Sequence, residues 1–470
     1  MTQTPIKFGT DGWRAIIGRD YTYENVRKVI QAWCDLHRND VKEPFVFLGY
    51  DRRFSSDLFA QEAAGVLAAN GVRVKLSQDF CPTPCISWMT KEKKALAGVM
   101  ITASHNPFQW NGVKFKEPYG GSASPEYCRE IEAQIEANDK AGKAPSFLSF
   151  EEAKGKGLVE TFDPHQEYVG QLRRMVDVEQ IRKANLKIAC DPLYGAGSGY
   201  FASVLSQPVV ALRSEANASF GGVNPEPIEK NLQALIDTVK REKCDLGLAT
   251  DGDADRIGAV DEKGNFIDSH KIFSLILRHL VKEKQWKGEV VTTVSTTQMV
   301  NRLSEKFGLK LSETPIGFKY ICQKFLEIEP LMGGEESGGI AVAKHVYERD
   351  GVLSGLFLLE ILAVHKKSFS QIIEDLQKEA GPLEFVRKDL HVPEEKIKAL
   401  KSRLKETPPS TLLGHKIARA HLLDGFKYFL EDSSWLLIRP SGTEPLLRLY
   451  AEAPTLEMAQ KMIGEGEKLI

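Results

Sequence analysis

Ser104 is the residue of this chain best placed for covalent chemistry. It lies in the sequence TASHNP (residues 102–107), directly after the apolar run at residues 97–101. An apolar run of this length, followed by polar and turn-forming residues, is typical of a buried strand. In α/β sheets the loop after such a strand opens into the crevice where ligands bind. We therefore expect the Ser104 hydroxyl to be exposed at the end of a strand, where it can carry a transferred group.

Three aspartates, Asp251, Asp253 and Asp255, occupy alternate positions between two strand-like apolar runs. Carboxylates this close repel one another unless a cation lies among them, and oxygen ligands suit Mg²⁺. A solvated acidic turn is the alternative interpretation. The spacing also resembles an EF-hand loop, but Arg256 stands where that loop needs a glycine, and its flanks would be helices. The pattern therefore favours a magnesium site.

The segment RPSGT near the end of the chain contains the groups that grip a phosphate. Arg439 supplies a guanidinium, and Ser441 and Thr443 supply hydroxyls. Gly442 lets backbone N–H groups approach an anion. The same residues also fit an ordinary turn. Their occurrence in one chain with an acidic cation site and a reactive serine favours phosphate binding.

Four further residues are candidates for contacts with a substrate. Lys114 follows a glycine turn ten residues after Ser104, so the strand-like run around it can return over the serine. Lys319 also follows a turn, and for both lysines a solvated side chain is the alternative. Glu335 and Ser337 are flanked by glycines, and their oxygens suit hydrogen bonds to sugar hydroxyls.

Other sequence features argue against a dinucleotide-binding enzyme, a P-loop enzyme and a zinc site. The sequence YGAGSG at residues 194–199 resembles a dinucleotide-binding turn, but its third glycine arrives one residue early, which favours a plain strand-to-helix loop. The chain has no P-loop motif. Cys81 and Cys85 have the spacing of half a zinc site, and no second cysteine or histidine pair completes it.

Composition is that of an ordinary globular protein, and it is compatible with small anionic substrates, because a local basic pocket needs no basic protein. The net charge is −2, with 42% hydrophobic and 27% charged residues, and no basic block suggests a nucleic-acid or membrane surface. Seven cysteines without paired spacing predict reduced thiols. The N-terminal residues lack the features of a signal peptide, and no apolar run is long enough to span a bilayer. We expect a cytoplasmic protein that is a monomer or a homodimer.

The chain contains a repeat of strand, polar loop and helix. The strands that begin each repeat are predicted at residues 45–51, 186–191 and 289–294. A later strand in each repeat ends in a motif, at residues 102–107, 251–256 and 334–339. Three similar units that present different loops to one centre explain this pattern.

The repeat predicts a four-domain organisation around a central cleft. We expect three α/β domains at residues 1–152, 153–259 and 260–378. A smaller C-terminal α+β domain follows at residues 379–470, because charged helix-like stretches there precede strands. A charged segment at residues 151–157 is predicted to link the first two domains.

Taken in order, five segments resemble the α-D-phosphohexomutase superfamily over essentially the whole chain. They are FGTDGWR (8–14), TASHNP (102–107), DGDADR (251–256), GEES (334–337) and RPSGT (439–443). The resemblance implies three similar α/β domains with mixed, largely parallel sheets, plus a smaller fourth domain. It also implies an isomerase that moves a phosphate between C1 and C6 of a hexose phosphate.

In that family pattern, Ser104 is phosphorylated in the resting enzyme and its phosphate shares one Mg²⁺ with Asp251, Asp253 and Asp255. The phosphoryl group passes to the free hydroxyl of the sugar. The resulting bisphosphate, glucose 1,6-bisphosphate for a glucose substrate, turns over and returns its other phosphate to Ser104. This bisphosphate is both intermediate and activator.

The resemblance implies roles for the neighbouring residues. Lys114 and His105 lie beside the phosphoserine, with Lys114 the candidate for proton transfers, and Arg14 supports charge in the transition state. Arg256 holds the phosphoserine region. Glu335 and Ser337 bind sugar hydroxyls in either orientation. The residues expected to contact the rest of the substrate, chiefly its non-reacting phosphate, are Arg439, Ser441, Gly442, Thr443, Lys319 and His345.

The family pattern favours glucose phosphate as the substrate. The sequences at 334–337, 314–319 and 345–350 resemble the phosphoglucomutase branch. Mannose and glucosamine phosphates are the alternatives, although enzymes of those branches usually carry a histidine where this chain has Gly339. The N-terminal loop resembles the glucosamine branch, with Trp13-Arg14-Ala15 in place of Ile-Arg-Gly. An inactive sugar-phosphate-binding protein is the alternative of a different class, disfavoured by the intact serine and aspartates.

Overall fold

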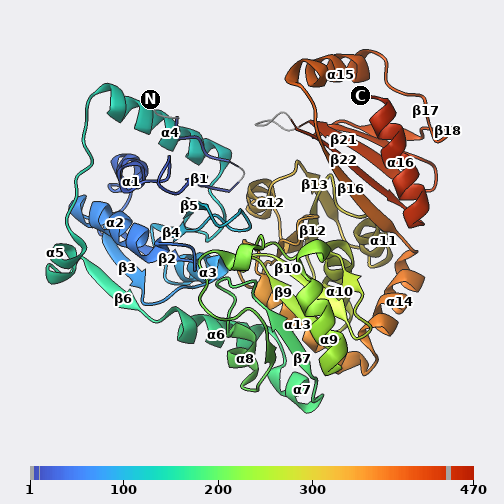
Figure 1. Ribbon diagram of the computed structural model, residues 1–470, viewed down its shortest axis with the longest axis horizontal. Helices are drawn as coiled ribbons and strands as arrows, with labels where there is room; N and C mark the ends of the chain where they lie inside the picture. The colour runs from blue at the N-terminus through green and yellow to red at the C-terminus, as the bar shows by residue number, and fades with distance from the viewer. Residues whose placement is uncertain (1–4, 10, 441–445) are drawn as a thin grey trace.

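The structure is a computed structural model, and it describes residues 5–9, 11–440 and 446–470. The chain builds four main sheets one after another along an arc (Figure 1). The first and the C-terminal domains lie at the two ends of this arc, and the second and third domains lie between them. Three α/β domains and an antiparallel C-terminal domain confirm the predicted fold class.

The first sheet has the strand order β1-β5-β4-β2-β3-β6, in which β2, β3, β4 and β6 are parallel. Its strands are β1 (Trp13–Ile16), β2 (Phe45–Tyr50), β3 (Arg73–Ser77), β4 (Ala97–Ile101), β5 (Trp110–Lys116) and β6 (Val159–Phe162). Its helices are α1 (Tyr23–His37), α2 (Ser56–Ala69), α3 (Thr83–Glu92), α4 (Pro125–Lys140) and α5 (Phe150–Gly155).

Alternation along β2 and β4 packs this sheet on both faces. Val46 and Leu48 of β2, with Val99 of β4, lie in the core that includes α1, α2 and α4. Phe47 and Met100 point the other way and join the core shared with the next two domains. Side chains that alternate between two apolar layers explain why both strands are apolar throughout.

The second and third domains contain shorter sheets of the same kind. The second has β7 (Ile188–Asp191), β8 (Val210–Ala211), β9 (Leu246–Thr250), β10 (Ile257–Asp261) and β11 (Phe266–Ile267), with α6 (Pro164–Met175), α7 (Val178–Lys183), α8 (Tyr200–Leu205) and α9 (Gln233–Glu242). The third has β12 (Glu289–Thr293), β13 (Leu311–Thr314), β14 (Pro330–Gly334) and β15 (Ile340–Val342), with α10 (Ser269–Lys282), α11 (Gln298–Lys306), α12 (Phe318–Phe325), α13 (Gly351–His365) and α14 (Phe369–Ala380).

The three α/β sheets share one feature that positions the motifs. In each, a central parallel strand is followed by an antiparallel partner: β4 by β5, β9 by β10, and β14 by β15. The loops between these strands contain Ser104, the three aspartates, and Glu335 with Ser337. The predicted repeat is therefore confirmed. It places each motif at the same point of its own sheet.

One continuous apolar core joins the first three domains. Helix α13 is apolar on every side, and it packs against α7, α10 and the strands β9 and β10. The cluster that includes Leu356 and Phe357 of α13 extends to Trp88 of the first domain. A helix with no polar face belongs in an interior, and α13 packs on the second sheet inside the core that the first three domains share.

The C-terminal domain has its own core and an antiparallel sheet. Its elements are β16 (Glu384–His391), α15 (Glu394–Glu406), β17 (Thr411–Leu412), β18 (His415–Lys416), β19 (Arg419–His421), β20 (Phe426–Phe429), β21 (Trp435–Pro440), β22 (Leu446–Ala453) and α16 (Leu456–Lys468). It contacts the third domain through a small cluster in which Val294 packs with Trp435 and Leu437. The backbone N–H of Gln298 also donates to Glu452 Oε2 at 2.8 Å.

The segment predicted to link the first two domains has a different structure. Residues 150–155 form helix α5, which begins with a capping box between Ser149 and Glu152. Strand β6 then pairs in parallel with β3. The first sheet thus continues beyond the predicted boundary at residue 152. The second sheet likewise continues past residue 259, because β10 and β11 close it.

The seven cysteines are free thiols, and all of them are buried. Residues 194–199 form a loop between β7 and α8, as predicted for a plain strand-to-helix connection. None of the helices within the described ranges combines the length and the apolar character that crossing a membrane requires.

Candidate functional site

The loops from the first three sheets meet at one place. Gly252 of the aspartate loop lies against Ser104, and a Cβ at this glycine would be only 2.4 Å from the Ser104 carbonyl oxygen. Ile257 N–H donates to the Gly338 carbonyl at 3.1 Å, which joins the aspartate loop to the third domain. The sequence-predicted motifs around Ser104, Asp251–Asp255 and Glu335 are therefore parts of one site.

Ser104 occupies a strained and enclosed position. Its φ of 51° is in the left-handed region, where residues other than glycine are uncommon. Its N–H donates to Thr102 Oγ1 at 2.9 Å, and its hydroxyl donates to Asp251 Oδ2 at 2.7 Å. The residue is 1% exposed. The expectation of an exposed hydroxyl is wrong, because the aspartate loop of the second domain packs over it.

Arg53 is the main anchor of the Ser104 loop, and sequence reasoning missed it. The arginine is 3% exposed, and its Nη2 donates to the Ser104 carbonyl at 2.6 Å and to the Asn106 carbonyl at 2.7 Å. Nη1 donates to two further carbonyls, that of Pro107 in the loop and that of Trp110 at the start of β5. One guanidinium thus satisfies three carbonyl oxygens of a loop that has no regular secondary structure and one at the start of the strand that follows it.

Asp51 completes this anchor. It accepts from Arg53 Nε at 3.1 Å and from the hydroxyls of Ser56 and Thr102. The sequence signal was present, because Asp51 and Arg53 directly follow the apolar strand β2. What the sequence could not show is that their partners lie about fifty residues later.

The three aspartates form a site that suits a cation. Asp251, Asp253 and Asp255 are fully buried, and each offers a carboxylate oxygen such that the three atoms lie within 4.8 Å of one another. Among the described atoms, Oδ1 of Asp253 and Oδ1 of Asp255 have no hydrogen-bond partner. Buried, unpaired carboxylate oxygens at this spacing fit a hard cation such as Mg²⁺.

Two effects set the electrostatics of this cluster, the crowding of buried carboxylates and the positive charge of Lys114 among them. Burial and the carboxylates of Asp255 and Asp253 raise the pKa of Asp251 well above its usual range. Burial acts the same way on Asp253, but the Lys114 ammonium outweighs it and lowers the pKa of that carboxyl.

Lys114 lies among the aspartates. Its Nζ is 2.8 Å from Asp253 Oδ2, 3.1 Å from Asp255 Oδ2 and 2.8 Å from Asp11 Oδ2. Burial favours the neutral amine, but these three carboxylates outweigh it and raise the pKa of Lys114. The sequence places Lys114 near the serine because β5 runs antiparallel to β4, and Lys114 pairs with Met100 in that register.

His105, Arg14 and Arg256 surround the serine loop. His105 Nδ1 is 3.5 Å from the Ser104 hydroxyl, and Arg14 Nη1 donates to Asn106 Oδ1 at 2.7 Å. Burial, with the guanidinium groups of Arg256 and Arg14, holds the pKa of His105 well below its usual range. The backbone N–H of Arg256 donates to Asp251 Oδ1 at 3.1 Å. The two arginines therefore supply the positive charge beside the serine loop, and His105 is a neutral imidazole next to the serine hydroxyl.

Glu335 and Ser337 face each other in the loop of the third domain. The Ser337 hydroxyl donates to Glu335 Oε1 at 2.8 Å, and Glu335 is 7% exposed. Burial raises the pKa of Glu335, although the nearby guanidinium of Arg349 opposes this effect. A carboxylate and a hydroxyl paired in this way offer acceptors for sugar hydroxyls.

Three residues of the surrounding ion-pair network were not assigned from the sequence. Asp11 contacts Lys114 and Arg349, and Glu348 accepts from Lys116 Nζ at 2.6 Å. All three residues lie in segments that resemble the family pattern. Asp11 belongs to FGTDGWR (8–14), and Glu348 and Arg349 belong to the segment at 345–350. Their partners belong to other domains, so the sequence alone does not show that they form ion pairs.

The remaining predicted residues lie elsewhere or outside the described part of the chain. Arg439, at the end of β21, donates from Nε to Asp424 Oδ2 at 2.9 Å. Ser441, Gly442 and Thr443 lie outside the described residues. Lys319 is partly exposed at the start of α12, with Nζ 5.6 Å from the Tyr320 ring centre.

His345 is 2% exposed and is engaged within the protein. Its Nε2 lies 3.0 Å from Asp350 Oδ2, and its Nδ1 lies 3.2 Å from Gln171 Nε2. Both ring nitrogens therefore have protein partners at the contact between α6 and the loop before α13. Its role in substrate binding stays a prediction.

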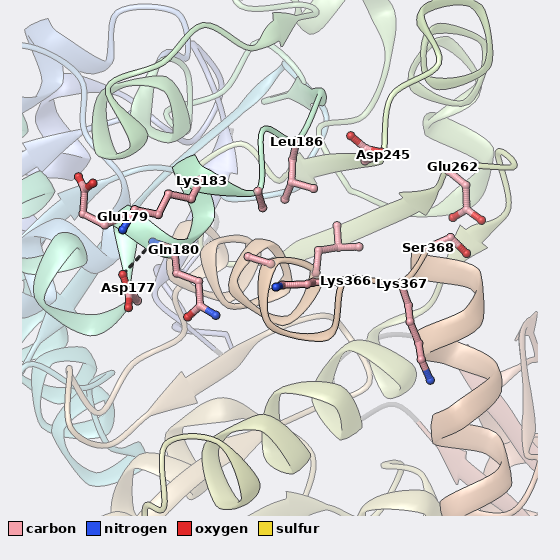
Figure 2. Close-up of a pocket in the computed structure, with 13 residues that line it drawn as sticks. Asp177, Glu179, Gln180, Lys183, Leu186, Asp245, Glu262, Lys366, Lys367 and Ser368 are labelled. Atoms are coloured by element: carbon pink, nitrogen blue, oxygen red, sulfur yellow. Dashed lines mark hydrogen bonds between the residues drawn. The ribbon is translucent and has the colours of Figure 1, made fainter.

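A separate hollow of about 730 Å³ lies between α7 and the junction of α13 with α14 (Figure 2). Lys183, Lys366, Glu262 and Ser368 are among its lining residues. It contains none of the residues predicted to do chemistry. The volume of this hollow therefore does not identify it as the candidate functional site.

Comparison with known proteins assigns the chain to a family. Sequence models described as phosphoglucomutase/phosphomannomutase α/β/α domains I, II and III match residues 5–142, 166–264 and 268–380. The model of the C-terminal domain matches residues 390–465. The chain belongs to the phosphoglucomutase/phosphomannomutase family. This family is part of the α-D-phosphohexomutase superfamily, as the five motifs predicted.

Similar proteins extend over nearly the whole chain. A phosphoglucomutase/phosphomannomutase of Thermococcus kodakarensis is 33% identical and aligns over 98% of both chains. A phosphoglucosamine mutase of Carboxydothermus hydrogenoformans is 30% identical over 97% of both. A crystal structure from Thermus thermophilus, provisionally named a phosphomannomutase, has a TM-score of 0.86 at 32% identity and covers 100% of this chain and 99% of its own. This family member is accordingly a phosphohexomutase, an isomerase of hexose phosphates.

We predict that Arg53→Lys lowers mutase kcat/KM by about 10- to 100-fold, as is usual when a supporting contact of an active group is lost. Lysine keeps the charge, but its ammonium has three N–H donors and cannot replace the contacts of one guanidinium with four carbonyl oxygens. Steady-state kinetics would measure the effect. Arg52→Lys is the matched control, because Arg52 donates to the Ser214 carbonyl and not to the Ser104 loop. Equal activity of Arg53→Lys and wild type would contradict the assignment.

Proposed function

We propose that this phosphohexomutase interconverts the 1-phosphate and 6-phosphate of an α-D-hexose through phosphorylated Ser104. The observation that carries the proposal is the hydrogen bond of 2.7 Å from the Ser104 hydroxyl to Asp251 within the buried aspartate cluster. A phosphoryl group on Ser104 would lie next to the proposed cation site. Positioning and charge neutralisation supply most of the catalysis in phosphoryl transfer, which suits this arrangement.

The proposed metal ligands are Asp251, Asp253, Asp255 and an oxygen of the Ser104 phosphate, and the proposed cation is one Mg²⁺. When bound, Mg²⁺ neutralises charge on the phosphoryl group and orients it for in-line transfer. The protein's own cations assist: Arg14 contacts Asn106 of the serine loop, and the Arg256 and Arg14 guanidinium groups lie close enough to lower the pKa of His105. Lys114 is proposed for proton transfer at the sugar oxygen, with His105 beside Ser104.

The opposite end of the substrate is proposed to bind the third and fourth domains. Glu335 and Ser337 accept hydrogen bonds from the sugar hydroxyls in both orientations of the bisphosphate intermediate. Arg439 with residues 441–443 grips the phosphate that is not reacting, and Lys319 assists. Closure of the C-terminal domain would exclude water, so that phosphorylated Ser104 transfers to sugar and not to water.

We propose glucose phosphates as the substrate, with glucose 1,6-bisphosphate as intermediate and activator. The GEES sequence and the segments at 314–319 and 345–350 support this choice. Glucosamine or mannose phosphate is the second candidate, and the names of similar proteins favour it. Cytoplasmic location and a monomeric or dimeric state remain predictions from the sequence.

A substrate panel tests the proposed function directly. Purified protein with Mg²⁺ and the matching bisphosphate is assayed on the 1-phosphates of glucose, mannose and glucosamine. We expect the highest kcat/KM for glucose 1-phosphate. A higher value for either other sugar would replace glucose as the substrate and leave the chemistry in place. No turnover on any hexose phosphate would contradict the mutase itself.

Ser104→Ala removes the proposed acceptor of the phosphoryl group and is expected to abolish nearly all mutase activity. Intact-mass spectrometry after treatment with glucose 1,6-bisphosphate would show one added phosphoryl group on the wild type and none on the variant. Ser206→Ala is the matched control and is expected to behave like the wild type. Ser104→Ala with wild-type turnover would exclude the phosphoserine route.

Asp253→Asn is expected to weaken Mg²⁺ binding and to reduce turnover strongly, because a neutral amide replaces one of three charged ligands. Isothermal titration with Mg²⁺ measures the first effect without relying on activity. Asp237→Asn, on the exposed face of α9, removes the same charge away from the site and serves as control. Unchanged Mg²⁺ affinity in Asp253→Asn would show that Asp253 is not a ligand and that the cation binds elsewhere.

A further inference from the structure

Arg349, in the loop between β15 and α13, contacts carboxylates from all three α/β domains. Its side chain is 4% exposed, and its Nη2 contacts Asp11 of the first domain and lies 3.0 Å from Asp255 Oδ2 of the second. Nη1 lies 3.6 Å from Glu335 Oε1 of the third. One cation therefore touches a proposed metal ligand and the proposed sugar-binding carboxylate.

Gly339 leaves the space through which the Arg349 side chain passes. A Cβ at position 339 would lie 2.2 Å from Arg349 Cδ and 2.8 Å from its Cγ, far inside van der Waals contact. Gly339 has no positive φ, so its backbone conformation does not require glycine. The Arg349 side chain can therefore take this path only because residue 339 has no side chain.

The backbone on both sides of Arg349 is tied to the aspartate loop. On the far side of β15, the Gly338 carbonyl accepts from the N–H of Ile257, the first residue of β10 after the aspartate loop, at 3.1 Å. After Arg349, Gly351 N–H donates to the Ala254 carbonyl at 3.0 Å. Arg349 Nε also donates to the neighbouring Glu348 at 3.1 Å. The backbone bonds fix the segment that carries Arg349 against the second domain, and the bond to Glu348 orients its guanidinium.

We propose that Arg349 is a positioning residue for hexose phosphate binding. It sets the separation between Glu335, at the sugar end, and Asp255, at the phosphoryl end. This inference rests on the proposed function and deepens it. A planar guanidinium with five donors faces several carboxylates at once, whereas a lysine ammonium does not reproduce that geometry.

The first test is Arg349→Lys, which keeps the positive charge but removes the planar set of guanidinium N–H donors. We expect Kd for glucose 6-phosphate, measured by isothermal titration, and KM to rise about tenfold or more, with a smaller change in kcat. A purely structural defect would instead lower kcat through loss of active molecules and leave Kd and KM unchanged. Arg173→Lys is the control, since Arg173 makes a comparable fork to carbonyls of Ser203 and Val204.

The second test uses Gly339→Ala, which adds a methyl where Arg349 Cδ lies without changing any charge. It is expected to weaken glucose 6-phosphate binding by a similar factor. Added to Arg349→Ala, it should cause no further loss, because the side chain it displaces is already gone. Additive losses in this double-mutant cycle would overturn the coupling between the two positions.

The outcomes separate this inference from the proposed function. Absence of mutase turnover and of glucose 6-phosphate binding in the wild type would contradict the proposed function. An active wild type, with Arg349→Lys and Gly339→Ala both binding glucose 6-phosphate as tightly, would overturn the role of Arg349 alone. If Arg349→Ala does not fold, as judged by circular dichroism, the Lys and Gly339→Ala variants decide the matter.

Discussion

The balance of buried charge at the meeting point of three loops is the constraint on which the rest of the structure depends. Six buried carboxylates gather there: Asp11, Asp251, Asp253, Asp255, Glu335 and Glu348. Lys114, Lys116 and Arg349 lie among them. Removing one partner of a buried ion pair leaves an uncompensated charge that costs about 3–5 kcal/mol. The domains must therefore stay in register for the charges to remain paired.

Repetition of one sheet design brings these charges together. In each of the first three domains a buried parallel strand ends in a loop and returns as an antiparallel strand. The shared apolar core, with α13 at its centre, fixes the three sheets relative to one another. The loops then carry different chemistry, namely a serine, a set of aspartates, and a carboxylate with a hydroxyl. The shared core holds the three loops at fixed positions, so that residues of one loop contact defined residues of the next.

The C-terminal domain is joined to the rest by fewer contacts. Its core is separate, and its contact with the third domain combines a small apolar cluster with polar pairs such as Lys427 to the Val294 carbonyl. Interfaces of this kind permit relative motion between domains. Motion of this domain, with the first three domains held in one core, would suit the proposed reaction, in which a bisphosphate intermediate turns over between two transfers.

The sequence by itself determined the repeat, the serine loop, the aspartate cluster and the loop with Glu335 and Ser337, because each is a local pattern of apolar runs and short polar motifs. It did not reveal Arg53, Asp11 or Arg349, whose partners lie far away in the chain. Helix α5 and strand β6 were also missed, since β6 is defined by its pairing with β3. Only the tertiary structure decided that Ser104 is enclosed, because the loop that covers it belongs to another domain.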